Sequence, residues 1–140
     1  MSDAPNSIPF LDTNILLRHL TADNPEQSPR ATALLAAIEA GELKVHITDV
    51  VIFETVYTLE RLYHQEKRAI REALSLILAL PGILLPKKRR LLSVLELYAT
   101  KNLLFADAYF AVIMRDLKTN TIMSFDRHFD RIQGITRREP

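Results

Sequence analysis

The pattern of apolar and polar positions divides the chain into short continuous apolar runs and longer stretches with helical spacing. Short apolar runs bounded by turn-forming residues are typical of buried strands, whereas apolar residues three or four positions apart indicate the buried side of a helix. We therefore expect strands at residues 8–11, 43–47, 83–85 and 121–125.

Helical spacing occupies most of the remaining chain. We expect helices at residues 13–20, 29–40, 49–63, 66–79, 91–98 and 104–118, and a short helical turn from Asp126 onward. Ser28 followed by Pro29 predicts a helix start, because serine is a preferred N-cap and proline fits the first helical position. The alternation of strands and helices predicts an α/β domain with a central, mainly parallel sheet flanked by helices. Because no repeat or linker interrupts it, residues 1–140 are expected to form a single domain.

Composition and charge narrow the function classes. The absence of cysteine excludes disulfides, thiolate metal sites and thiol nucleophiles. A net charge of +1 does not by itself indicate a nucleic-acid binder, although basic residues cluster at 87–90 and again at Arg127, His128, Arg131, Arg137 and Arg138. The first ten residues lack the features of a secretory signal, and the apolar stretch 76–85 is shorter than the ~20 residues of a membrane-spanning helix. We expect a cytoplasmic protein that does not enter a membrane.

Four acidic residues lie inside or at the edge of strongly apolar stretches: Asp12, Glu54, Asp107 and Asp126. A carboxylate is rarely buried without a positive or hydrogen-bonding partner, and the first three have no basic neighbour in the sequence. A divalent cation such as Mg²⁺ or Mn²⁺, held by carboxylate oxygens, would supply the missing charge. Asp12 and Asp126 also follow predicted strands, at the sheet edge where open α/β folds bind ligands. Because Mg²⁺ often contacts substrate phosphate, the implied substrate is a phosphate ester.

Each carboxylate except Glu54 also has a simpler interpretation. Asp12 and Asp126 are suited to N-capping the helical segments that follow them. Asp107 would interact favourably with the dipole of its helix. One common cause is favoured over four coincidences: the four carboxylates converge, and a bound metal relieves their mutual repulsion. The histidines His19, His46, His64 and His128 form no metal-binding pair at helical spacing and are assigned no catalytic role.

The chain resembles the PIN-domain nucleases, and more narrowly the VapC-type toxins of bacterial toxin–antitoxin pairs. The resemblance covers residues 10–135 and rests on four ordered motifs: FLDTNILLR, DVVIFETVYTLE, FADAYFAVIM and SFDRHFDRI. It implies a three-layer PIN-like fold and metal-dependent hydrolysis of RNA phosphodiester bonds.

The resemblance also implies roles for individual residues. Asp12 and Asp107 would be the direct metal ligands, and Glu54 and Asp126 would complete the acidic cluster. Asn14 and Ser124 match positions that orient these carboxylates. Asp130 matches either an auxiliary acid or a helix-surface residue, and the second interpretation is favoured.

Three partners follow from the same resemblance. The substrate would be RNA. A small VapB-like antitoxin would cover the acidic cleft and place an arginine against the carboxylates. A second copy of the chain would form a homodimer, for which residues 74–85 supply either an apolar interface or simply part of the core.

Two other function classes fit parts of the sequence. A Mg²⁺-dependent phosphoryl-transfer domain would use Asp12 as its nucleophile. Two residues argue against this class: Asn14 occupies the position where such a domain would have a second aspartate, and Glu54 would have no role in it. A non-catalytic RNA-binding or interaction module is the third class, and the complete acidic quartet argues against it.

Overall fold

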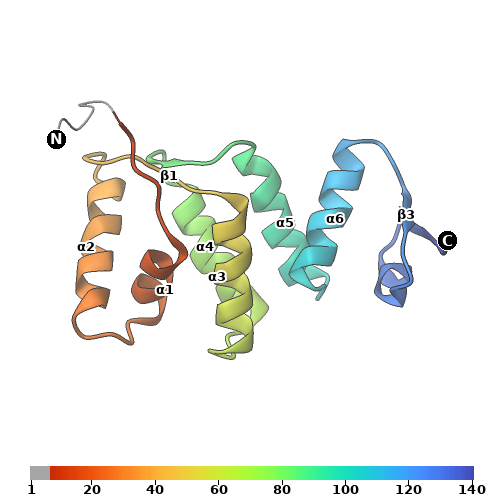
Figure 1. Cartoon of the computed structure of the whole chain (residues 1–140), viewed down its shortest axis with the longest axis horizontal. Coiled ribbons are helices and arrows are strands. Elements are labelled where there is room, and N and C mark those ends of the chain that lie inside the picture. Colours follow the sequence, from red (N-terminus) through yellow and green to blue (C-terminus); the bar gives the residue numbers. More distant parts are fainter. Residues whose placement is uncertain (1–6) are drawn as a thin grey trace. The chain divides into compact units, whose positions relative to one another are not determined.

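The computed structural model describes residues 7–140, whose contacts form two compact units, the first ending at Lys88 and the second covering Arg89–Pro140. Each unit contains helices and one pair of short parallel strands (Figure 1). The expected absence of a secretory signal concerns residues 1–10, of which 1–6 lie outside the described residues.

The first unit is organised around a short parallel sheet. Strand β1 (Val45–His46) pairs with β2 (Ile83–Leu84), so that Val45 lies opposite Ile83. The expected strand at residues 8–11 is reduced to a parallel bridge between Phe10 and His46, in which the Leu11 amide donates to the His46 carbonyl at 2.8 Å. The chain therefore leaves the carboxyl end of this bridged segment directly before Asp12.

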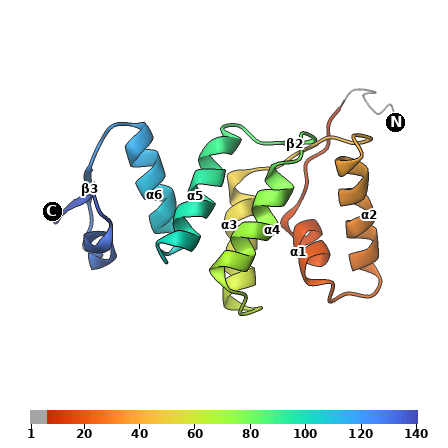
Figure 2. The ribbon, with the colours of Figure 1, turned by 180° about the vertical axis from the view of Figure 1, so that it is seen from behind.

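Four helices cover the first unit: α1 (Thr13–Thr21), α2 (Gln27–Glu39), α3 (Asp49–Arg61) and α4 (Lys67–Leu78). Helix α1 packs against α2 and α3, and α3 packs against α4 (Figure 2). Their fully buried side chains include Leu16, Ile38, Ile52, Leu59 and Leu74. In α4, the buried residues Ile70, Leu74, Ile77 and Leu78 recur at helical spacing.

The start of α2 differs from its prediction. The helix begins at Gln27, and Ser28 is buried within its first turn instead of serving as the N-cap. The Asn24 side chain accepts hydrogen bonds from the backbone amides of Glu26 and Gln27, at 3.1 and 2.8 Å. Asparagine performs the same capping chemistry as serine, so the helix starts earlier than Ser28 suggests.

Gly82 allows strand β2 to approach helix α2 closely. A side-chain carbon at this position would lie 2.9 Å from Ile38 Cγ2 and 2.9 Å from the Leu43 carbonyl oxygen. The Gly82 carbonyl in turn accepts a hydrogen bond from the Val45 amide at 2.9 Å. The sheet of the first unit therefore requires a residue without a side chain at position 82.

The second unit contains α5 (Lys88–Thr100), α6 (Phe105–Asp116), β3 (Thr121–Met123), the 3-10 helix η1 (Arg127–Arg131) and β4 (Thr136–Arg138). Strands β3 and β4 are parallel, with Thr121 opposite Thr136. Aromatic edge-to-face contacts join its elements, with ring centroids 5.4 Å apart for Tyr98 and Phe105 and 5.6 Å for Phe110 and Phe129. The sequence pattern did not predict β4.

The α/β class with parallel strands is confirmed. The strands are shorter than expected and form two separate parallel pairs among the described residues. Within residues 7–140, no helix combines the length and the apolar character needed to cross a membrane.

Candidate functional site

Asp12 caps helix α1 and keeps one carboxylate oxygen open. Its Oδ1 accepts a hydrogen bond from the Thr13 amide at 2.8 Å, as the N-cap interpretation predicted. Its Oδ2 accepts no hydrogen bond from residues 7–140, and the side chain is exposed. Asp12 is therefore held by its backbone contact while retaining an oxygen for a ligand.

Asp126 repeats this arrangement in the second unit. It follows β3 and caps η1, with Oδ1 accepting from the His128 amide at 2.9 Å and lying 2.9 Å from His128 Nδ1. The Asp126 amide donates to the Ser124 hydroxyl at 2.9 Å, so Ser124 helps to position this segment. Oδ2 again has no hydrogen-bond partner in the described chain.

Glu54 lies on the exposed side of α3, so its expected burial is wrong. The helical period places it beside Val50 and Tyr57, which are 62% and 64% exposed, whereas Ile52 and Val56 face the core. The surrounding sequence is apolar on both sides of the helix, which is why the local pattern suggested burial. With no hydrogen bond or ion pair to a described residue, the Glu54 carboxylate is available to a ligand.

Asp107 is the one member of the quartet that is buried, with 6% of its surface exposed. It lies in the first turn of α6, where the helix dipole favours a negative charge. The prediction of a carboxylate in a buried position is therefore confirmed for Asp107. It is wrong for Asp12, Glu54 and Asp126, which are exposed.

Asp130 is paired to a cation within its own unit. Its carboxylate accepts two hydrogen bonds from Arg137, which hold the pKa of Asp130 below its usual value. A carboxylate engaged in this way serves the structure of the loop, in agreement with the favoured surface interpretation. Asn14 is exposed and forms no hydrogen bond with residues 7–140, so no contact there orients a carboxylate.

The sequence pattern did not single out Arg137, whose side chain organises the segment around Asp126. The side chain is only 12% exposed, and its Nη1 donates to the Ser124 carbonyl at 3.1 Å. It stood in the sequence as one member of a basic cluster. Only the pairing of β4 with β3 brings it beside Ser124, so no local signal could have identified it.

The chemistry of the carboxylates fits a hard divalent cation. Asp12, Glu54 and Asp126 each have a carboxylate oxygen that accepts no hydrogen bond within residues 7–140. Oxygen atoms are the ligands that Mg²⁺ and Mn²⁺ prefer. Asp12 and Glu54 belong to the first unit, and Asp107 and Asp126 to the second. Neither unit by itself gathers three His, Asp or Glu side chains from described residues into a metal-binding group.

Comparison with known proteins assigns the family. No curated protein matches the sequence. The PIN domain matches residues 10–135, a range that contains all four carboxylates and nearly every element of both units. The chain therefore belongs to the PIN-domain family.

Proposed function

We propose that the chain is a Mg²⁺- or Mn²⁺-dependent endoribonuclease and the toxin of a toxin–antitoxin pair. PIN domains are generally metal-dependent nucleases. The observation that carries the proposal is shared by Asp12 and Asp126. Asp12 follows the segment that is bridged in parallel to β1, and Asp126 follows the parallel strand β3. Each uses Oδ1 to cap the next helix, and its Oδ2 accepts no hydrogen bond within residues 7–140.

In this proposal residues 1–140 act as one domain in which the four carboxylates serve one site. Asp12 and Asp107 are the metal ligands, and Glu54 and Asp126 complete the negative charge of the site. A bound divalent ion would supply Lewis-acid stabilisation of the phosphodiester and lower the pKa of a hydrolytic water. The capping bonds of Asp12 and Asp126 hold their carboxylates in fixed directions, which reduces the reorganisation that ligand binding requires.

The substrate proposed is RNA, bound through its phosphates by exposed cations. Arg127, Arg131 and Arg138 are exposed on the second unit. Lys88 is less suitable, because its Nζ donates to the Leu80 carbonyl at 3.0 Å and burial lowers its pKa. If these cations bind phosphates, RNA affinity should fall as salt rises.

A VapB-like antitoxin and a second copy of the chain are the proposed protein partners, and the cytoplasm is the proposed compartment. An antitoxin arginine would pair with the exposed carboxylates of Asp12 and Glu54. Within residues 74–85, Leu74 and Leu78 are fully buried, whereas Leu76 is 67% exposed. We therefore expect Leu76 to contribute most to a homodimer from this segment. Sedimentation should show a dimer that Leu76→Asp weakens, and a wild-type monomer at micromolar concentration would contradict this.

The decisive experiment is cleavage of total bacterial RNA by the purified chain with Mg²⁺, Mn²⁺ or a chelator. Wild-type protein should give discrete fragments only with metal, and Asp12→Asn and Asp107→Asn should each abolish them. Asparagine retains capping at residue 12, so loss of activity there would not reflect an unfolded helix. Calorimetric titration with Mn²⁺ provides a second readout, in which both variants should lose binding. Full metal-dependent cleavage by either variant would refute the site assignment.

A further inference from the structure

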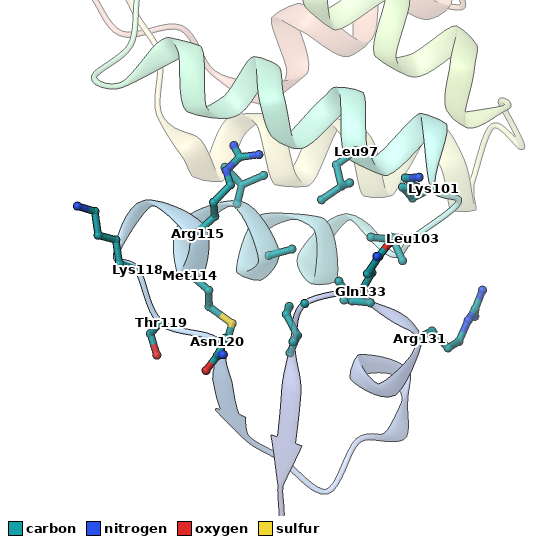
Figure 3. Close-up of a pocket in the computed structure, with 15 residues that line it drawn as sticks. Leu97, Lys101, Leu103, Met114, Arg115, Lys118, Thr119, Asn120, Arg131 and Gln133 are labelled. Atoms are coloured by element: carbon teal, nitrogen blue, oxygen red, sulfur yellow. The ribbon is translucent and has the colours of Figure 1, made fainter.

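The second unit contains a cavity of about 790 Å³ whose lining includes no Asp or Glu. Its walls come from the end of α5, the second half of α6, the connection between these helices, and the segments that lead into β3 and β4 (Figure 3). Asp107 lies near the start of α6, four residues from the lining residues Leu103 and Ala111, and does not itself line the cavity, whereas Arg115 near the other end of the helix does. Asp126 likewise follows the opposite end of β3. None of the four proposed catalytic carboxylates therefore contributes to the cavity lining.

The cavity lining combines aliphatic side chains with the polar residues Thr119, Asn120 and Gln133. Leu97, Leu103, Val112, Met114, Ile132 and Ile135 contribute to its lining. The residues that line it include no Phe, Tyr, Trp or His. Such a surface suits aliphatic side chains, whereas proteins that bind single-stranded nucleic acid stack its bases on aromatic rings. A volume of this size is within the range of pockets that enclose a ligand.

The rim of the cavity is positively charged. Lys101 and Arg131 lie at one end, and Arg115 and Lys118 lie at the other (Figure 3). All four side chains are exposed, and none forms an ion pair with a residue in the described part of the chain. No Asp or Glu lines the cavity, and Asp116, the neighbour of Arg115, is not part of its wall. The rim is therefore complementary to an acidic ligand.

We propose that this cavity binds an acidic amphipathic segment of a partner protein. Aliphatic side chains of the segment would enter the cavity, and its Asp or Glu residues would face the cations at both ends. An amphipathic helix places apolar residues in a groove at positions i, i+3, i+4 and i+7, and its flanking positions can carry acids. This assignment explains the aliphatic lining and the charged rim together, whereas a phosphate ligand would explain only the rim. It does not rest on nuclease activity.

A labelled peptide of Leu and Glu, with Leu at helical spacing, is the probe, and fluorescence anisotropy with the full chain is the measurement. The peptide should bind saturably, and a scrambled peptide of equal composition should bind at least about tenfold more weakly. The double variant Arg115→Glu, Lys118→Glu should reduce affinity for the ordered peptide by at least about tenfold. The matched control is Lys44→Glu, Arg68→Glu, which reverses two exposed cations of the first unit and should change affinity by less than about twofold.

Each contrary result has a defined meaning. The absence of saturable peptide binding up to about 1 mM overturns the proposal. Equal binding of the ordered and scrambled peptides, or equal losses in both double variants, would show general charge attraction and also overturn it. Binding of a single-stranded RNA oligonucleotide, but not the peptide, with sensitivity to Arg115→Glu, Lys118→Glu would identify a phosphate site instead. Circular dichroism confirms that each variant is folded.

Discussion

Arg137 binds Asp130 through two parallel hydrogen bonds, from Nε to Oδ1 at 2.9 Å and from Nη2 to Oδ2 at 3.2 Å. The remaining nitrogen, Nη1, donates to the Ser124 carbonyl at 3.1 Å and to Glu139 Oε1 at 2.7 Å. A planar guanidinium makes all these bonds from one fixed geometry. Arg137 therefore connects β4 to both sides of the segment that carries Asp126.

Arg137→Ala should lower RNA cleavage without removing any proposed metal ligand. The loss of the connection lets the segment from Ser124 to Asp130 move, so Asp126 is no longer held in one position. Arg137→Lys should restore little of the lost cleavage rate, because a lysine ammonium cannot donate two parallel hydrogen bonds to the Asp130 carboxylate. The measurement combines cleavage rates with NMR relaxation of the Phe129 and His128 amides.

The matched control for this prediction is Arg138→Ala. Arg138 neighbours Arg137 and carries the same charge, but its side chain is exposed and makes no hydrogen bond or ion pair in the described structure. Arg138→Ala should therefore leave amide relaxation near Asp126 unchanged. If both variants reduced cleavage equally while the loop stayed rigid, a positioning role for Arg137 would be ruled out and a charge effect would remain.

Acid should loosen the same segment. The hydrogen bonds from Arg137 hold the pKa of Asp130 below its usual 3.8. A carboxylate whose pKa is lowered by folding stabilises the structure above its unfolded pKa, and this contribution is lost as the pH falls through the folded value. NMR should therefore show the Phe129 amide becoming mobile as the pH falls from about 5 to below about 3.

Asp130→Asn tests whether this carboxylate is the group responsible. The variant should show a mobile Phe129 amide already at neutral pH, with little further change on acidification. Asp23 provides an internal reference in the first unit, since its hydrogen bond from Tyr63, and then that from Thr21, lower its pKa independently. An unchanged acid response of the second unit in Asp130→Asn would assign the transition to another group.

Glu54→Gln should separate activity from stability. Because Glu54 is exposed and has no described partner, the substitution should change the free energy of unfolding by less than about 0.5 kcal/mol. RNA cleavage should nevertheless fall sharply if this carboxylate completes the metal site. Glu72→Gln, on the exposed side of α4, is the matched control and should alter neither quantity. Normal cleavage by Glu54→Gln would remove Glu54 from the site.

The helices of this chain were predictable because their signals are local. Apolar residues at helical spacing located α3 and α6 to within about two residues, the usual uncertainty of helix ends. The same local pattern failed for the burial of Glu54, because an apolar stretch does not reveal which side of a helix faces the core. The sequence pattern also did not predict contacts that form only when segments far apart in the sequence pair with each other. β4 has the sequence TRR and becomes a strand only through β3, and Arg137 meets Asp130 only as a result.

The parallel pairing of β3 and β4 also limits how this region can change in length. A chain that leaves one strand and enters its parallel neighbour must return to the starting end, which needs about a dozen residues or more. The connection from Ser124 to Ile135 is close to that minimum and includes Asp126 and the whole of η1. Because the connection has no residues to spare, a deletion within it would change the register between β3 and β4, and would not simply move Asp126. Variation in length should instead occur outside this connection, and natural or engineered insertions within it should be rare.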